Sequence, residues 1–396
     1  MPVPAMVDAA RVSDPALRPI AAKVRAGERL TAADALALFQ SPDILGIGAM
    51  ADAATRARHG DRVFFAANQH INPTNICTLR KTCVFCSYAR LPKEAGAYRY
   101  TMEQVYAEAD ANAYVREFHI VGGLDMEAGL DYYAEMFRGL KARRPDVHIK
   151  ALTAVEIAHL ARIEKVSERE VLQALKDAGL TSLPGGGAEV FSTAVRATIA
   201  ERKLTGEEWL RVHRIAHQLG IPSNCTMLYG HVETADDRIE HLSMLRGLQD
   251  ETGGFLTYIP LAYHPENNEL GEELGRVGSA TTGYEDLKNI AIGRLFLDNI
   301  PHMKTHWPMV TPFLSQIALA FGCDDVEGTV VFERIYHEAG ATTDMHMPYM
   351  RLVRLIRGAG KRPVERNSLY EPVRDTFDGI EDEAGAIGGQ PTVHAA

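Results

Sequence analysis

The feature that most constrains the fold of this chain is a regular alternation of short β-prone runs with amphipathic helical stretches, which begins near residue 62. Such alternation is typical of βα units, whose strands run parallel to one another. The eight candidate strands lie at 62–67, 117–121, 148–152, 182–183, 223–228, 255–260, 299–302 and 328–332. The helices predicted between them lie at 102–115, 129–142, 168–177, 206–219, 236–250, 283–297 and 308–320.

Eight such units in about 280 residues predict an α/β fold of the (β/α)8 TIM-barrel type. An open doubly wound sheet is the alternative, but no dinucleotide fingerprint follows any predicted strand. The predicted parts are an N-terminal helical extension over 1–60, the barrel over 61–345 and a C-terminal extension over 346–396. Thr31 and Asp34 have the spacing of a capping box in the first part. The Gly-, Glu- and Ala-rich segment 378–396 is predicted to be a loose tail.

Charge and hydropathy narrow the class of partner. The 396 residues carry a formal net charge of −10, which argues against nucleic acid or an acidic membrane surface as a partner. No apolar run approaches the length that a bilayer requires, and the N-terminus lacks the basic start and apolar stretch of a secretory signal. We therefore predict a cytoplasmic protein, without membrane insertion, that acts on a small molecule.

Three of the five cysteines, Cys77, Cys83 and Cys86, fall within ten residues just after the first predicted strand. Thiolates are soft ligands, and three from one loop suit an iron–sulfur cluster with one iron left open. The alternative is a structural zinc site, which needs a fourth ligand such as His70. Zinc motifs usually consist of two pairs of ligands that are separated in the sequence. The remaining cysteines are isolated and form no second pair, so the pattern favours the iron–sulfur cluster.

Polar side chains recur at the predicted carboxyl ends of the strands, where a barrel of this type exposes its active site. The set consists of His70, Asn72, Asp125, Glu189, His264, His302, Lys304 and His306. Any one of these histidines is more often a satisfied structural residue than a catalyst. Their recurrence at the same end of the barrel raises the probability of a site there.

Two glycine-rich strand ends also have functional interpretations. Gly122 and Gly123 can let the backbone approach the amino and carboxylate groups of a bound amino acid, although a tight βα turn explains them equally well. After the fourth strand, Glu189 can accept hydrogen bonds from ribose hydroxyls and Arg196 can pair with a carboxylate. A surface ion pair is the structural alternative for these two. Tyr88, close to the last cysteine of the loop, can shield a cluster or contact a nucleoside.

Longer sequence motifs indicate the protein family more specifically than the three cysteines do. They include Asn72-Pro-Thr-Asn-Ile-Cys77, His119-Ile-Val-Gly-Gly-Leu124, Ser182-Leu-Pro-Gly-Gly-Gly-Ala-Glu189, Thr226-Met-Leu-Tyr-Gly-His-Val-Glu233 and Ile259-Pro-Leu-Ala-Tyr-His-Pro265. With these motifs the chain resembles the radical S-adenosylmethionine (SAM) enzymes, and within them the aminofutalosine synthases of the futalosine route to menaquinone. The resemblance covers nearly the whole barrel.

The resemblance implies cofactors, partners and roles. It implies a 4Fe-4S cluster on Cys77, Cys83 and Cys86, bound SAM, and a one-electron donor such as flavodoxin or ferredoxin. The residues expected to contact SAM are Tyr88, Gly122, Gly123, Glu189 and Arg196, with Arg196 on the methionine carboxylate. Expected substrate-binding residues are Asn72, His302, Lys304 and His306, and expected catalytic residues are Asp125, His264 and His70.

The implied reaction is addition of the 5′-deoxyadenosyl radical to 3-[(1-carboxyvinyl)oxy]benzoate, which makes the protein a transferase. A related cyclase that abstracts hydrogen is the alternative within the class, and a zinc-stabilised nucleoside-binding barrel is the alternative outside it. Two departures from the family stand out. The cysteine spacing is C-x5-C-x2-C where the superfamily has C-x3-C-x2-C, and Asp125 stands where the family has histidine.

Overall fold

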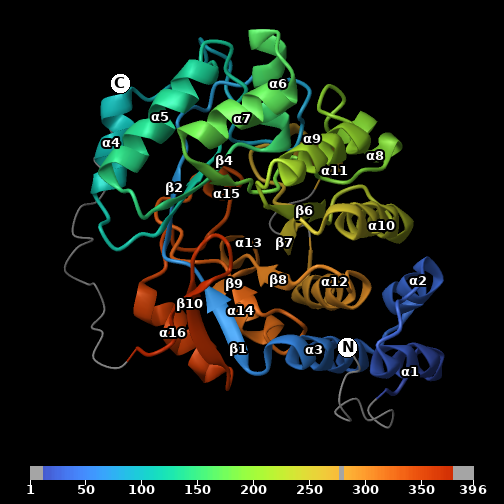
Figure 1. Ribbon diagram of the computed structural model, residues 1–396. Helices are drawn as coiled ribbons and strands as arrows, with labels where there is room; N and C mark the ends of the chain where they lie inside the picture. The colour runs from blue at the N-terminus through green and yellow to red at the C-terminus, as the bar shows by residue number, and fades with distance from the viewer. Residues whose placement is uncertain (1–11, 276–280, 378–396) are drawn as a thin grey trace.

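Parallel strands gather at the centre of the molecule, as the computed structural model shows for residues 12–275 and 281–377 (Figure 1). The strands are β1 (Arg62–Phe65), β2 (Asn68–Ile71), β3 (Glu117–Ile120), β4 (His148–Ala151), β5 (Leu180–Ser182), β6 (Ser223–Tyr229), β7 (Phe255–Ala262), β8 (His302–Thr305) and β9 (Asp325–Val326). Parallel pairing joins β2, β3, β4 and β5 in one sheet and β6, β7, β8, β9 and β1 in another.

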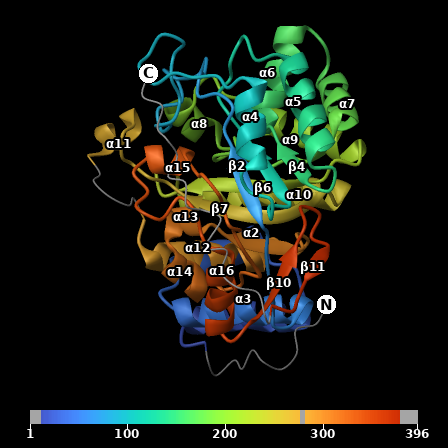
Figure 2. The ribbon, with the colours of Figure 1, turned by 90° about the vertical axis from the view of Figure 1, so that its left-hand side faces the viewer.

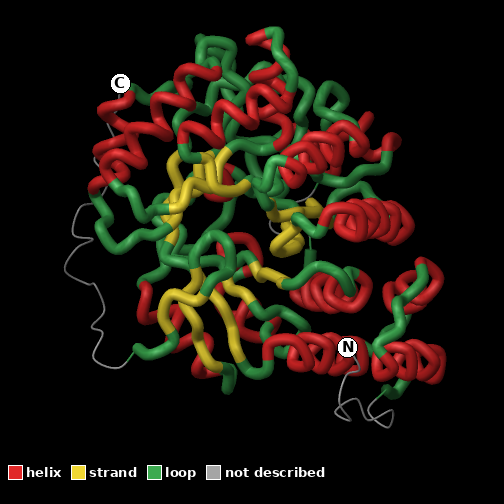
Figure 3. Tube along the Cα trace, viewed as in Figure 1, coloured by secondary structure: helices red, strands yellow, loops and turns green. Residues whose placement is uncertain are grey.

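Two parallel bridges, from Leu183 to Ser223 and from Gln69 to Val331, connect these sheets on both sides. Because β1 and β2 are successive pieces of one extended segment, the pairing closes into a barrel of eight strand positions. Helices surround the strands (Figure 3). The predicted TIM-type α/β barrel is therefore confirmed.

The seventh predicted strand, 299–302, is wrong in its bounds, because β8 begins only at His302. Pro301 precedes it, has no N–H to donate to a ladder and ends a turn. The shift has a large consequence for the site. His302 lies at the amino end of its strand, at the opposite end of the barrel from the expected mouth.

Two other predicted elements differ near the end of the barrel. The eighth strand is β9 at Asp325–Val326, and the predicted run 328–332 is irregular because Val330 and Phe332 have positive φ. The predicted helix 308–320 is split into α13 (Trp307–Val310) and α14 (Pro312–Ala318). Thr311 has φ 75° and precedes Pro312, which disfavours a continuous helix.

Helices follow the strands in the sequence, in some places two in succession. They are α4 (Met102–Asp110), α5 (Leu130–Arg143), α6 (Ala154–Glu164), α7 (Glu168–Ala178), α8 (Thr193–Ile199), α9 (Gly206–Gln218), α10 (Ala235–Thr252), α11 (Glu269–Leu274), α12 (Gly283–Phe296), α15 (Ile335–Glu338) and α16 (Tyr349–Gly358). Both α6 and α7 follow β4, and both α8 and α9 follow β5. A capping box formed by Thr153 and Glu156 starts α6 directly after β4. None of the described helices has both the length and the apolarity to cross a membrane.

Two extensions lie at the lower end of the molecule in Figure 2. The N-terminal extension folds into a 3₁₀ turn (Pro15–Leu17), α1 (Arg18–Ala26), α2 (Ala32–Gln40) and α3 (Ile44–His59), and the predicted capping box at Thr31 is present. In the C-terminal extension, β10 (Arg362–Arg366) pairs in parallel with β1, and β11 (Pro372–Arg374) pairs antiparallel with β10. Residues 378–396, predicted as a tail, lie outside the described residues. The domain bounds stay a prediction, because β10 continues the barrel sheet.

Paired charges fill the interior of the barrel beneath its mouth. Lys150 Nζ lies 2.8 Å from Glu117 Oε2, and Arg366 Nε lies 2.5 Å from Asp325 Oδ2, with all four side chains at most 1% exposed. Lys304 Nζ lies 3.2 Å from Glu327 Oε2. Each buried charge thus has an opposite partner, which is the condition for charges to remain inside a protein.

Candidate active site

A cavity of about 260 Å³ opens at the carboxyl ends of the strands, and Cys77, Cys83 and Cys86 all line it. Their loop folds as successive turns, in which Cys83 N donates to Leu79 O at 2.9 Å and Cys86 N donates to Cys83 O at 3.1 Å. The five residues between Cys77 and Cys83 form the first of these turns, in which Arg80 N also donates to Cys77 O at 3.2 Å. All three thiols are free.

The spread of the three thiols distinguishes a cluster from zinc. Thiolates that share one zinc ion at 2.3 Å lie about 3.8 Å apart. Within the described residues, the one group of three or more metal-ligating side chains with atoms inside 4.8 Å of each other lies elsewhere, at His59, His302 and Asp324. The three Sγ atoms therefore do not all lie within 4.8 Å of one another, a spread that suits a multi-iron cluster better than a single zinc ion. Cys225 and Cys323 are fully buried and do not line the cavity.

Gly122 and Gly123 are required by the cysteine loop itself. A Cβ on Gly122 would lie 2.8 Å from Thr74 O, and one on Gly123 would lie 2.1 Å from Ile76 O. Both glycines also line the cavity. In this structure the backbone that approaches the two glycines closely is the loop segment 74–76, and their predicted contact with a bound amino acid stays a prediction.

Glu156 and Tyr88 also line the cavity and fix its wall. Glu156 accepts hydrogen bonds from Gly122 N at 2.9 Å and from Thr153 N at 2.7 Å. Burial raises the pKa of the Glu156 carboxyl to about 7. The Tyr88 hydroxyl shares a 2.6 Å hydrogen bond with that of Tyr98.

A lysine that the sequence reasoning missed connects two predicted site residues. Lys203 Nζ lies 2.6 Å from Glu189 Oε1 and 3.9 Å from Cys83 Sγ. Burial raises the pKa of the Cys83 thiol, and the Lys203 ammonium counteracts part of that rise. Glu189 has φ 48°, a strained conformation that recurs at functional sites.

Arg196, expected at the methionine carboxylate, does not line the cavity. Its guanidinium donates to Ala188 O at 2.6 Å, to Val190 O at 3.2 Å and to Leu204 O. These bonds hold the turn that carries Glu189.

The inner part of the cavity combines apolar and imidazole groups. Leu228, Ile259 and Leu261 form apolar walls, and His119 and His306 are the imidazoles. Burial lowers the pKa of His306 to about 4, and His306 Nδ1 has no hydrogen-bond partner within the described structure. Burial also holds the pKa of His119 well below its usual range. Both rings are therefore neutral near pH 7.

Four other predicted site residues do not line the cavity. His70 packs against His119 with ring centroids 4.5 Å apart. Asn72 Nδ2 donates to Val121 O at 2.9 Å, and His264 Nε2 contacts Met309 O at 3.1 Å. Lys304 lies below the cavity, paired with Glu327.

Asp125 is likewise turned away from the cavity. Its side chain is 2% exposed and lies 2.6 Å from Arg99 Nε. Burial opposes its charge, yet hydrogen bonds led by those from Arg99 hold its pKa below the usual value. It also accepts from Thr74 Oγ1 at 3.1 Å, so Asp125 braces the segment that leads into the cysteine loop.

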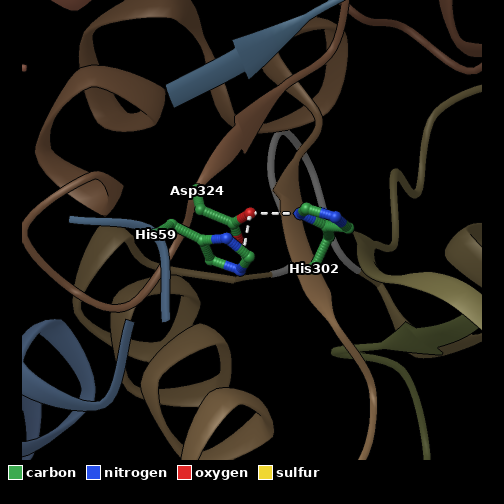
Figure 4. A group of neighbouring side chains, drawn as sticks. All are labelled: His59, His302 and Asp324. Carbon is green, nitrogen blue, oxygen red and sulfur yellow. Dashed lines mark hydrogen bonds and ion pairs between the residues drawn. The ribbon is translucent and has the colours of Figure 1, made fainter. Parts of the chain in front are cut away.

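His302, at the amino end of β8, belongs to a separate cluster with His59 and Asp324, which Figure 4 shows. Its Nδ1 lies 2.5 Å from Asp324 Oδ2, and His59 Nε2 lies 3.5 Å from the same oxygen. The His59 and His302 rings stack with centroids 4.7 Å apart and an interplanar angle of 19°. Imidazole lone pairs lie in the ring plane, so stacked rings do not converge on one cation. This cluster is a packing element, which Tyr370 covers at 3.9 Å from the His302 ring.

A thiol-lined cavity at the mouth of a β/α barrel defines the class of protein, and comparisons with known proteins agree. The sequence profile of the radical SAM superfamily matches residues 71–245, and that of the CofH/MqnC C-terminal region matches 252–378. The solved structure of methylornithine synthase (PylB) superimposes with a TM-score of 0.69 at 17% identity, covering 86% of this chain and 96% of that one. The protein is a radical SAM enzyme, which uses SAM and an iron–sulfur cluster. The zinc alternative is set aside.

Three relatives define the family more closely. The aminodeoxyfutalosine synthase of Thermus thermophilus is 44% identical, over 93% of this chain and 99% of the relative. A hydroxyphenyl transferase of Methanopyrus kandleri, which acts on 5-amino-6-(D-ribitylamino)uracil and L-tyrosine, is 40% identical over 80% and 85%. The cyclic dehypoxanthine futalosine synthase of Streptomyces coelicolor is 37% identical over 90% and 88%. The chain belongs to the aminodeoxyfutalosine synthase family.

Proposed function

We propose that the protein converts SAM, 3-[(1-carboxyvinyl)oxy]benzoate and water into 6-amino-6-deoxyfutalosine, methionine and bicarbonate, a step of menaquinone biosynthesis by the futalosine pathway. The observation that carries the proposal is the cavity, which joins the three thiols to an apolar, imidazole-bearing inner part. The 44% identity to a synthase of that name supports it.

The cysteine loop is the proposed holder of a 4Fe-4S cluster, with flavodoxin or ferredoxin as electron donor. When bound, the cluster and SAM supply an electron and a 5′-deoxyadenosyl radical. The residues of the chain bind SAM and the substrate, orient them toward each other and exclude water from the cavity. A primary radical reacts with whatever lies closest, so placement decides the product.

The outer part of the cavity is the proposed SAM site. Glu189 can accept from ribose hydroxyls, and Gly122 and Gly123 leave backbone accessible to the methionine moiety. Because Arg196 is committed to backbone carbonyls, Lys203 replaces it as the candidate partner of the methionine carboxylate.

The inner part is the proposed substrate site. The substrate carries two carboxylates and an aromatic ring, which suits apolar walls with a few hydrogen-bond donors. His306 and His119 line this part and are uncharged. Each neutral ring still has one N–H, which it can donate to a substrate carboxylate. Of the substrate-binding residues expected from the sequence, His306 is the one that lines the cavity.

The nucleoside product tests the proposal against the hydrogen-abstracting alternative. Anaerobically reconstituted protein is incubated with SAM, dithionite and the enolpyruvyl benzoate, and products are analysed by mass spectrometry. Addition retains C5′, so the product should contain adenine and the benzoate skeleton together, with methionine in equal amount. Free 5′-deoxyadenosine as the main product would favour cyclase-type chemistry. The Cys83→Ala variant is the matched control and should form neither product.

A further inference from the structure

Backbone pairing holds Lys203 against the cysteine loop. Cys83 forms an isolated antiparallel bridge with Ala200, and Val84 N donates to Ile199 O at 3.0 Å. Lys203 follows in the turn that closes when its N–H donates to Ala200 O at 2.9 Å. The lysine therefore reaches the loop from a fixed base.

The ammonium group has three close neighbours. It lies 2.6 Å from Glu189 Oε1, 3.9 Å from Cys83 Sγ and 5.3 Å from the centre of the Phe85 ring. Its side chain is 13% exposed. In such surroundings a charge acts on its neighbours with less screening than in water.

Lys203 is also the one lysine or arginine among the described residues that line the cavity. The basic residues inside the cysteine loop, Arg80 and Lys81, do not line the cavity. Arg80 Nη1 lies 2.5 Å from Glu269 Oε1, and Lys81 is exposed. Lys203 thus supplies the positive charge in the lining of the cavity, where Glu189 reduces its effect, and Arg80 acts on Cys86 from outside this lining.

We infer that the Lys203–Glu189 pair sets the reduction potential of the iron–sulfur cluster. One electron from the donor converts the oxidised cluster to the reduced cluster and adds one negative charge, with no proton required. A positive charge beside a ligand sulfur favours the reduced state, and a negative charge beside it favours the oxidised state. The inference rests on the proposed function only in requiring that the loop hold a cluster.

The two members of the pair should therefore shift the potential in opposite directions. Lys203→Met removes the positive charge, and we expect the ratio of reduced to oxidised cluster at a fixed potential to fall tenfold or more, a downward shift of about 59 mV or more for one electron. Glu189→Gln removes the opposing charge and should raise the ratio. Lys203→Arg keeps the charge and should stay within about threefold of the wild type.

The experiment is a redox titration of the full-length, reconstituted protein without SAM, with reductant added in steps and the reduced cluster quantified by electron paramagnetic resonance. Iron and sulfide are measured for every variant. Lys81→Met is the matched control, because it removes an exposed lysine of the same loop, and its ratio should not change. Where Lys203→Met holds no cluster, the Glu189→Gln variant decides the sign of the shift, and Lys203→Arg tests whether the charge is sufficient.

An unchanged potential in Lys203→Met or in Glu189→Gln would overturn the inference. If SAM binding weakened in Lys203→Met while its potential stayed at the wild-type value, Lys203 would act only on the methionine carboxylate. A wild-type protein that takes up no iron and sulfide would refute the proposed function itself, and with it the inference.

Discussion

Arg99 holds Asp125 through two hydrogen bonds, from Nε to Oδ2 at 2.6 Å and from Nη2 to Oδ1 at 2.8 Å. The pair joins the segment after the cysteine loop to the strand end after β3. Since Asp125 also accepts from Thr74, the acid is a brace for the start of the loop.

Asp125→Ala should therefore destabilise the protein by about 2–3 kcal/mol, the order of a lost charged hydrogen-bond set. Denaturant unfolding followed by circular dichroism measures this loss. Asp125→Asn retains the shape and should lose less. Equal stability of Asp125→Ala and the wild type would show that the brace has no structural role.

The cysteine loop should be the sole source of protein ligands. Alanine at Cys77, Cys83 or Cys86 is expected to abolish the cluster, because each removes one of three thiolates. Iron content and visible absorption after anaerobic reconstitution measure this. Cys225→Ala and Cys323→Ala are matched controls that should retain the cluster, and its loss in either would contradict the assignment.

His306→Ala should raise the KM for the benzoate substrate about tenfold, the effect of one lost hydrogen bond of about 1.4 kcal/mol. Iron content should stay at the wild-type level, since His306 is not one of the proposed cluster ligands. Burial lowers the pKa of His306 to about 4, so the ring stays neutral between pH 6 and 8. Its titration should therefore not change KM over that range. A KM equal to that of the wild type would remove His306 from the substrate site.

Glu156 should make stability depend on pH. Burial raises its folded-state pKa from 4.5 to about 7, so the folded protein retains a proton that the unfolded chain has lost between these values. The contribution of Glu156 to the free energy of unfolding is complete below pH 4.5 and is lost as the pH rises through 7, a change of about 3 kcal/mol. Denaturant unfolding of the apoprotein from pH 5 to 7.5 tests this. Glu156→Gln should lose less stability over that range, and an identical slope would refute the assignment.

The buried pair Arg366–Asp325 should contribute strongly to folding. Arg366→Met leaves Asp325 buried without its partner and should cost about 3–5 kcal/mol. Arg351→Ala breaks a pair with Asp344 whose side chains are 41% and 69% exposed, and should cost less than about 1 kcal/mol. Comparable unfolding midpoints for the two variants would contradict this difference.

Local sequence signals predicted much of the fold. The alternation of elements identified β3, β4 and β6 to within one residue, because these strands end in recognisable turns. It misplaced β8, since a proline marked the start of the strand and not its interior. That error put His302 at the wrong end of the barrel.

The site was predictable where residues share a loop and less so where contacts are long-range. The three cysteines are neighbours in sequence, whereas Lys203 reaches Cys83 only because β-type pairing brings the end of α8 to the loop. Nothing in the local pattern around Lys203 indicates that contact. His119 had a usable signal, because strand alternation puts it on the opposite face from Phe118 and Ile120.

The pairing of Val63 with Pro363 in β1 and β10 has a consequence for biosynthesis. While the chain is being translated, the first strand emerges long before β10, so the edge of β1 that β10 covers stays unpaired until residues 362–366 have been made. The bridge from Gln69 to Val331 can close the barrel before β10 is made, but this edge of β1 gains its partner only through a contact about 300 residues distant in sequence. Ribosome-bound intermediates that end before residue 362 would thus display an open strand edge, the kind of surface that chaperones shield from aggregation.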